Sequence, residues 1–193
     1  MRRELLTARN KTGTRDKLAM DSRICACILQ VISELKPRMI AGYQAVSGEP
    51  DISPALLELH QLGHAICLPV VHKQVAGEME FRHWSPESLL HKNRFGIPEP
   101  SEPGQVALSE IGLVLTPLLG YSAEGHRIGM GGGYYDRIFV SPGVNDPMFR
   151  GGDSMIRCGV AYSSQETPLG APDSWDIALH GVINELGWFT FKR

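Results

Sequence analysis

Glycine, arginine and aspartate are concentrated in one short segment of this chain, which reads GHRIGMGGGYYDR from Gly125 to Arg137. Four of the five residues at 129–133, here called the glycine loop, are glycine. Such a loop can adopt left-handed backbone angles and can bring several N–H groups against one ligand. A helix expected from Tyr134 adds the positive end of its dipole. This segment therefore predicts a phosphate ligand.

Charged side chains flank the glycine loop. Arg127 and Arg137 can clamp phosphate oxygens, and Asp136 can hold Mg²⁺, which prefers one or two carboxylates together with substrate phosphates. A purely structural interpretation stays open, because glycines also build tight turns and Asp136 can stabilise a helix N-terminus by about 0.3–1 kcal/mol. The spacing is neither that of a P-loop, since no Gly-Lys-Ser/Thr follows, nor that of a dinucleotide fingerprint in a first βα unit.

The elements that must position this loop alternate between helices and short apolar strands. Apolar residues at helical spacing predict a helix over 15–35, and Ser53 and Pro54 are the expected N-cap and first residue of a second helix, which Gly63 closes. This alternation predicts an α/β fold of three layers, a mostly parallel sheet with helices on both faces. The expected strands are 39–46, 65–71, 79–84, 111–116, 155–162 and 179–183, and the expected surface loops are 98–104 and 141–153.

Composition limits the class of protein. The 193 residues are 42% hydrophobic and carry 19 Lys+Arg against 21 Asp+Glu, a formal charge of −2. This fits a single domain over 1–193 and excludes a disordered chain, a collagen or a coiled coil. The balanced charge gives no argument for a nucleic-acid partner. Basic residues near the N-terminus are interpreted as a solvated helix face with one or two phosphate-reaching arginines; they are Arg2, Arg3, Arg9, Lys11 and Arg15.

Neither a membrane segment nor an export signal is expected. The longest stretch without Asp, Glu, Lys or Arg is 59–72, and a spanning helix needs roughly 20 apolar residues. The cysteines fit no zinc pattern and are expected to be reduced core residues of a cytoplasmic protein, a disulfide being the alternative. They are Cys25, Cys27, Cys67 and Cys158.

The glycine loop and its flanks closely resemble the signature of the 5-formyltetrahydrofolate cyclo-ligase family, also called 5,10-methenyltetrahydrofolate synthetases. Further segments resemble the same family in the same order along nearly the whole chain. These segments are YQAVSGE at 43–49, LPVV at 68–71 with MEF at 79–81, NRFGIPEP at 93–100 and WDIAL at 175–179.

The resemblance implies a fold similar to that of ribose-5-phosphate isomerase and CoA transferases. It also implies a reaction in which 5-formyltetrahydrofolate and ATP become 5,10-methenyltetrahydrofolate, ADP and phosphate, with Mg²⁺. The γ-phosphoryl group would pass to the formyl oxygen, N10 would attack the formyl carbon, and phosphate would leave. No protein nucleophile is required, so positioning and charge stabilisation would supply the catalysis. The expected partners are these small molecules, with neither nucleic acid nor membrane, and the expected state is a monomer.

The resemblance also implies the site residues. Arg127, Tyr134 and Asp136 would be catalytic, and Asp136 and Asp176 would bind Mg²⁺. Glu49 would hold the folate, because a carboxylate can accept two N–H bonds from the amino-amide edge of a pterin. The implied ATP-binding residues are Arg2, Arg127, Ile128, Gly129, Met130, Gly131, Gly132, Gly133, Tyr134 and Tyr135. The implied substrate-binding residues are Glu49, Met130, Gly131, Gly132, Gly133 and Tyr134.

Two positions depart from the family pattern. Leu6 stands where the family has an arginine that reaches ATP, and Arg9 can substitute for it from one turn later. Ser122 stands where the family has an aspartate after an aromatic residue, here Tyr121. These departures keep a second hypothesis open, a homologue that binds folate or nucleotide without turnover. Phe81 and Tyr121 are further candidates to face the folate, with core packing as the alternative.

Overall fold

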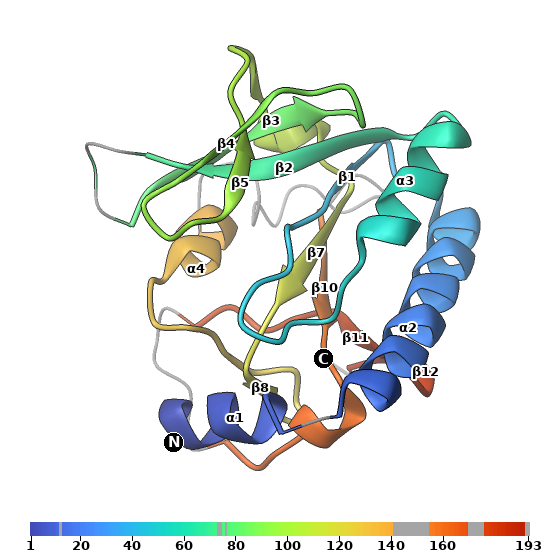
Figure 1. Ribbon diagram of the computed structural model, residues 1–193, viewed down its shortest axis with the longest axis vertical. Coiled ribbons are helices and arrows are strands. Elements are labelled where there is room, and N and C mark those ends of the chain that lie inside the picture. Colours follow the sequence, from blue (N-terminus) through green and yellow to red (C-terminus); the bar gives the residue numbers. More distant parts are fainter. Residues whose placement is uncertain (12, 73–74, 76, 141–154, 170–175, 192–193) are drawn as a thin grey trace.

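The computed structural model describes residues 1–11, 13–72, 75, 77–140, 155–169 and 176–191 (Figure 1). The expected loop at 141–153 lies outside the described residues. No described helix is both long enough and apolar enough to cross a membrane. The described α-helices are α1 (Arg2–Arg9), α2 (Thr14–Leu35), α3 (Ser53–Gln61) and α4 (Tyr134–Phe139), and the 3-10 helices are η1 (Leu108–Glu110) and η2 (Ser163–Gln165).

One large sheet organises the part of the chain that the structure describes. Its strand order is β12-β11-β10-β7-β1-β2-β3-β6. The strands from β11 to β2 run parallel, and antiparallel pairs finish both edges. Its strands are β1 (Met39–Ala41), β2 (Ala65–Val71), β3 (Met79–Trp84), β6 (Gln105–Val106), β7 (Leu113–Pro117), β10 (Ile156–Val160), β11 (Gly181–Asn184) and β12 (Gly187–Thr190).

Two small antiparallel pairs lie outside this sheet. One pair is β4 (Leu90–Lys92) with β5 (Pro98–Pro100), which is here called the 90–100 hairpin. The other is β8 (Gly120–Tyr121) with β9 (Arg127–Ile128), and it leads directly into the glycine loop.

Helices cover both faces of the sheet, which confirms the three-layer α/β fold. On one face, apolar residues of α2 and α3 such as Ile28 and Leu56 form the larger core with Leu113 and Leu115. On the other face, α4 contributes Phe139 to a second core with residues of β1, β2 and β3. Figure 1 shows α2 and α3 on one side of the strands, α4 on the other, and α1 where β7 leads into β8.

This arrangement creates a topological switch point at the carboxyl ends of β1 and β7. The two strands are parallel neighbours, but the chain leaves β1 toward α3 and leaves β7 toward α4, on opposite faces of the sheet. Ligands of open α/β sheets bind at such a switch point. The segment after β1 holds Glu49, and the segment after β7 holds the glycine loop, so the fold brings both to one place.

Most predicted elements are confirmed, with bounds shifted by a few residues. The strand expected over 39–46 is shorter and ends at Ala41, the last residue paired with β2 and β7. Gly42, which follows it, packs so closely on α3 that a Cβ would lie 2.8 Å from Leu56 Cδ1. The helix expected to be capped by Ser53 has Ile52 at the cap position instead. There the Asp51 carboxylate accepts a hydrogen bond from the Ser53 N–H at 3.0 Å.

The loop expected over 98–104 was a wrong prediction in its first part. Residues Pro98–Pro100 form β5, and Glu99 within it is buried. The physical reason is antiparallel pairing with β4, in which His91 stands opposite Glu99. The Val71 N–H of β2 also donates to the Glu99 carboxylate at 2.9 Å, so a segment with loop composition is held against the sheet.

Candidate active site

The glycine loop leaves the β8–β9 pair with its backbone partly in the left-handed region. Gly131 has φ 98° and Gly133 has φ 65°, angles that favour glycine. Ile128 is buried and anchors the start of the loop, whereas Met130 at its tip is 54% exposed. Arg2 of α1 donates from Nε to the Gly129 carbonyl at 3.2 Å, which places this predicted ATP-binding residue beside the loop.

Arg127 and two acids form the charged centre of the site. The Arg127 guanidinium donates to the Asp136 carboxylate and, at 2.6 Å, to the Ile177 carbonyl. Burial lowers the pKa of Arg127, while the charges of Asp136 and Asp176 act in the opposite direction. The predicted pair of acids therefore converges on one arginine from segments 40 residues apart in the sequence (176 − 136).

An aromatic ring supports this arginine from within the core. The Arg127 guanidinium carbon lies 5.0 Å from the centroid of the Phe139 ring, and that of Arg157 lies 5.7 Å from the same centroid. Arg157 is buried and donates from Nε to the Ala178 carbonyl at 3.0 Å. Both cations thus lie within cation–π range of one ring of α4, so packing as well as charge positions Arg127.

Glu49, predicted to hold folate, lies buried after β1. Its carboxylate accepts the Val46 N–H at 3.0 Å and lies 3.8 Å from Arg9 Nη1. Burial raises the pKa of Glu49, and the Val46 N–H and the Arg9 charge oppose that rise. Arg9 also donates to the carbonyls of Ser47 and Leu118. Arg9 is therefore used in bonds to other protein groups, so it does not take over the ATP contact of the arginine that Leu6 replaces.

Tyr135 joins the two halves of the site. Burial raises the pKa of Tyr135, the Glu49 charge raises it further, and the Arg127 charge lowers it. Tyr135 therefore lies within the range of both charges. Glu49 after β1 and Arg127 before the glycine loop therefore both influence the same tyrosine.

Two predicted roles near the loop change with the geometry. Arg137, expected to clamp phosphate, donates to the carbonyls of Gly132 at 2.8 Å and Gly77 at 3.0 Å, so it holds the loop against the β2–β3 connection. The six-residue α4 is too short to give much of the dipole expected of it. The donors that this site offers to an anion are therefore mainly loop N–H groups and arginine side chains.

The 90–100 hairpin supplies contacts that sequence reasoning missed. Arg94 donates from Nη2 to the Tyr134 hydroxyl at 2.9 Å, and the Phe95 ring meets the Tyr134 ring edge-on at 6.4 Å between centroids. The sequence offers no local signal for this, because the hairpin and the loop are far apart along the chain. The NRFGIPEP segment pointed to the family but not to this contact.

Other candidates lie elsewhere. Phe81 and Tyr121 are fully packed in two separate cores. Ser122 accepts the Glu124 N–H at 3.2 Å within the β8–β9 turn, so it has a structural use. All four cysteines are free thiols, as expected.

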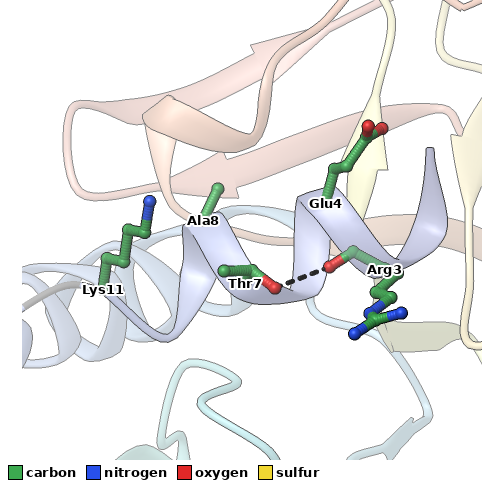
Figure 2. Close-up of a pocket in the computed structure, with 5 residues that line it drawn as sticks. All are labelled: Arg3, Glu4, Thr7, Ala8 and Lys11. Atoms are coloured by element: carbon green, nitrogen blue, oxygen red, sulfur yellow. Dashed lines mark hydrogen bonds between the residues drawn. The ribbon is translucent and has the colours of Figure 1, made fainter.

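A hollow lies along α1. Figure 2 shows the side chains that line it, which are Arg3, Glu4, Thr7 and Ala8 of the helix and Lys11 just after it. The Thr7 hydroxyl donates to the Arg3 carbonyl at 2.8 Å, and Glu4 pairs with the N-terminal amine at 2.9 Å. The residues of this hollow are exposed, so the basic cluster near the N-terminus is divided: Arg2 lies by the glycine loop, Arg9 is buried, and Arg3 and Lys11 face outward.

The acidic side chains of this site can hold Mg²⁺ only when a bound substrate supplies further oxygen atoms. Within the described residues, no group of three or more His, Cys, Asp or Glu side chains forms a metal cage. Mg²⁺ needs fewer protein ligands than this, because it keeps waters and binds substrate phosphates. Asp136 and Asp176, beside a loop suited to phosphate, fit that requirement.

An α/β sheet with a glycine loop and two acids at its switch point is typical of enzymes that bind a phosphate-bearing substrate. The model of the 5-formyltetrahydrofolate cyclo-ligase family matches residues 1–185. The chain belongs to this family.

Individual relatives agree with this assignment. The 5-formyltetrahydrofolate cyclo-ligase of Escherichia coli K12 is 37% identical over 148 residues, which cover 75% of this chain and 76% of the relative. The protein of the same name from Haemophilus influenzae is 29% identical over 157 residues, 80% of each chain.

Solved structures show the same fold. The 5,10-methenyltetrahydrofolate synthetase of Aquifex aeolicus superposes with a TM-score of 0.81 at 24% identity, covering 100% of this chain and 91% of that one. That of Mycoplasma pneumoniae gives a TM-score of 0.72 at 22% identity, covering 95% and 96%.

Proposed function

We propose that this protein converts 5-formyltetrahydrofolate and ATP into 5,10-methenyltetrahydrofolate, ADP and phosphate. The observation that carries the proposal is the meeting of the glycine loop, the Arg127–Asp136 pair and buried Glu49 around Tyr135. Family membership gives the reaction, and this geometry supports a place for each substrate.

The nucleotide phosphates would lie on the glycine loop. Loop N–H groups, Arg2 at Gly129 and the Arg127 guanidinium offer donors to phosphate oxygens. The proposed ATP-binding set is Arg2 with the segment from Arg127 to Tyr135. Met130, the three glycines at 131–133 and Tyr134 would also contact the folate, whose other contact would be Glu49.

Asp136 and Asp176 would hold Mg²⁺, with phosphate oxygens as further ligands. The ion would supply positive charge to the phosphates during transfer. In its absence Arg127 pairs with Asp136, and the charge of Asp176 also acts on this arginine. The single positive charge of Arg127 therefore offsets part of the negative charge that the two carboxylates place beside the glycine loop.

No protein nucleophile is proposed. Burial raises the pKa of Cys67 to about 12, so this thiol stays protonated at neutral pH and is a poor nucleophile. Catalysis would then consist of aligning the formyl oxygen with the γ-phosphate and stabilising the transferred charge with Arg127 and the loop N–H groups. Once the oxygen is phosphorylated, ring closure by N10 expels phosphate.

The test is to follow the absorbance of the methenyl product while purified protein, Mg²⁺, ATP and 5-formyltetrahydrofolate are mixed. The proposal predicts a rise that needs all three small molecules. Separate omissions of ATP and of Mg²⁺ serve as controls. A rise without ATP would contradict the proposed phosphoryl transfer.

A homologue that binds both ligands without turnover is the second candidate. Leu6 and Ser122 support it, because both depart from the family pattern. Arg9 supports it as well, because its guanidinium is hydrogen-bonded to backbone carbonyls. It predicts calorimetric binding of both ligands with no absorbance change.

We further propose a monomer in a reducing, cytoplasmic compartment. The free state of all four cysteines supports the reducing compartment. Sedimentation at micromolar concentration tests the monomer, and a concentration-dependent dimer would contradict it.

A further inference from the structure

The 90–100 hairpin stands apart from the main sheet, yet its tip reaches the glycine loop. The hairpin turn carries Arg94 and Phe95, and both meet Tyr134. The Arg94 guanidinium carbon also lies 5.0 Å from the centroid of the Phe95 ring, so the two side chains form one unit against Tyr134.

Asn93 fixes the shape of this tip. Its Oδ1 atom accepts the N–H groups of Phe95 at 2.8 Å and Ile97 at 3.1 Å. Gly96 completes the turn with φ 77°, an angle that favours glycine. With its two acceptor bonds, Asn93 sets the direction in which Arg94 and Phe95 project.

Asn93 is in turn tied to the main sheet through a buried acid. Its Nδ2 donates to Glu99 Oε1 at 2.5 Å, and the same oxygen accepts the Val71 N–H at the end of β2 at 2.9 Å. Burying a carboxylate is costly unless it is well bonded. The two hydrogen bonds to Oε1 fix where this oxygen lies between β2 and Asn93.

We propose that Glu99 and Asn93 are positioning residues of the active site. They connect β2 to the hairpin tip and thereby hold Arg94 and Phe95 against Tyr134, the first residue after the glycine loop. The inference rests on the proposed function, because its effect is on the residue placed between the two substrates. Glu99 has no proposed role in binding nucleotide, metal or folate, and this inference gives that buried acid a function.

The test is a double-mutant cycle on kcat/KM for 5-formyltetrahydrofolate. Asn93→Asp keeps the Oδ acceptor of the turn but loses the donor and places a second carboxylate against Glu99. We expect it to lower kcat/KM about tenfold in the wild-type background. In the background of Arg94→Ala with Phe95→Ala, where the tip no longer reaches Tyr134, the same change should cost less than twofold.

A purely structural role gives a different pattern. Asn93→Asp would then lower the melting temperature in both backgrounds and lower kcat/KM equally in both, or in neither, and either result would overturn the proposal. Glu99→Gln, whose amide oxygen still accepts both bonds, should lose less activity than Glu99→Ala. Should Asn93→Asp not fold, Asn93→Ser takes its place, because its hydroxyl can serve the turn but is too short for Glu99.

Ser101→Ala is the matched control. It removes a 2.9 Å hydrogen bond from Ser101 Oγ to the Leu89 carbonyl at the other end of the same hairpin, and kcat/KM should stay within twofold. If the wild-type protein does not turn over, the proposed function fails by itself. The same cycle, measured as the Kd of MgATP, then still decides whether the tip is coupled to the glycine loop.

Discussion

Arg127 occupies the centre of the site because three different contacts hold its guanidinium. Asp136 and the Ile177 carbonyl accept its hydrogen bonds, and the Phe139 ring lies beneath it. A planar guanidinium can serve all three at once, whereas a lysine ammonium lacks both the fork and the stacking face.

Arg127→Lys should therefore lower kcat/KM by about 10- to 100-fold, since a hydrogen bond to a charged group contributes about 1.5–3 kcal/mol. Steady-state kinetics at saturating Mg²⁺ give the measurement, with the melting temperature as the check on folding. A variant within twofold of the wild-type protein would show that charge alone suffices at this position.

The burial of Glu49 also predicts how the free energy of unfolding depends on pH. Burial raises its pKa in the folded state, so the stability that it contributes is present below its unfolded pKa of about 4.3 and is lost as the pH rises through the folded value. Glu49→Gln does not titrate. The unfolding free energy of the variant minus that of the wild-type protein should therefore increase with pH above about 4.3 and be flat below it.

Urea unfolding at a series of pH values measures this difference. A difference that falls as the pH rises would mean that Arg9 and the Val46 N–H outweigh burial at Glu49.

At the scale of elements, α1 is fastened by one buried side chain. Arg9 is 3% exposed and joins α1 to the segments after β1 and β7 through Ser47, Leu118 and Glu49. This contact helps to place Arg2, at the other end of the helix Arg2–Arg9, beside the glycine loop.

Arg9→Ala should lower the unfolding free energy by about 3–5 kcal/mol, because it leaves the Glu49 carboxylate buried without its cation. Arg3→Ala on the exposed side of α1 is the control, with an expected change within about 0.5 kcal/mol. Chemical denaturation of both variants makes the comparison. Equal small effects would show that α1 is held by its apolar contacts instead.

Elements with a clear local pattern could be predicted from the sequence, and contacts across the fold could not. The strands at 65–71 and 79–84 are observed with the predicted bounds, because alternating and apolar runs fix a strand locally. Glu99 lies in a segment of Pro, Glu, Ser and Gly, and it is a strand residue because β5 pairs with β4, while its carboxylate accepts the Val71 N–H of β2. Short strands such as β8 and β9 carry too few residues for a pattern.

The site divides in the same way. The residue types of the glycine loop predicted a phosphate-binding segment, and the resemblance added Glu49 and Asp176, which no local pattern joins to it. The sequence could not show that Arg137 is used to hold the loop or that Arg9 is used to hold α1. Both are arginines at plausible phosphate positions, and only the carbonyl groups around them decide their roles.

At the scale of the whole molecule, the site depends on opposite connections from two neighbouring parallel strands. The segment after β1 carries Glu49, which we propose to bind folate, and the segment after β7 carries the glycine loop, which we propose to bind phosphate. The charges near both segments act on Tyr135, so we expect the two substrates to meet there in one reaction.

The most direct measurement counts ADP and methenyl product together, in the wild-type protein and in Asp136→Ala. The account predicts one ADP for each methenyl product in the wild-type protein, and a loss of Mg²⁺-dependent turnover in a variant that still folds. ADP formed without folate, or an Asp136→Ala variant that keeps full turnover with only a lowered melting temperature, would contradict it.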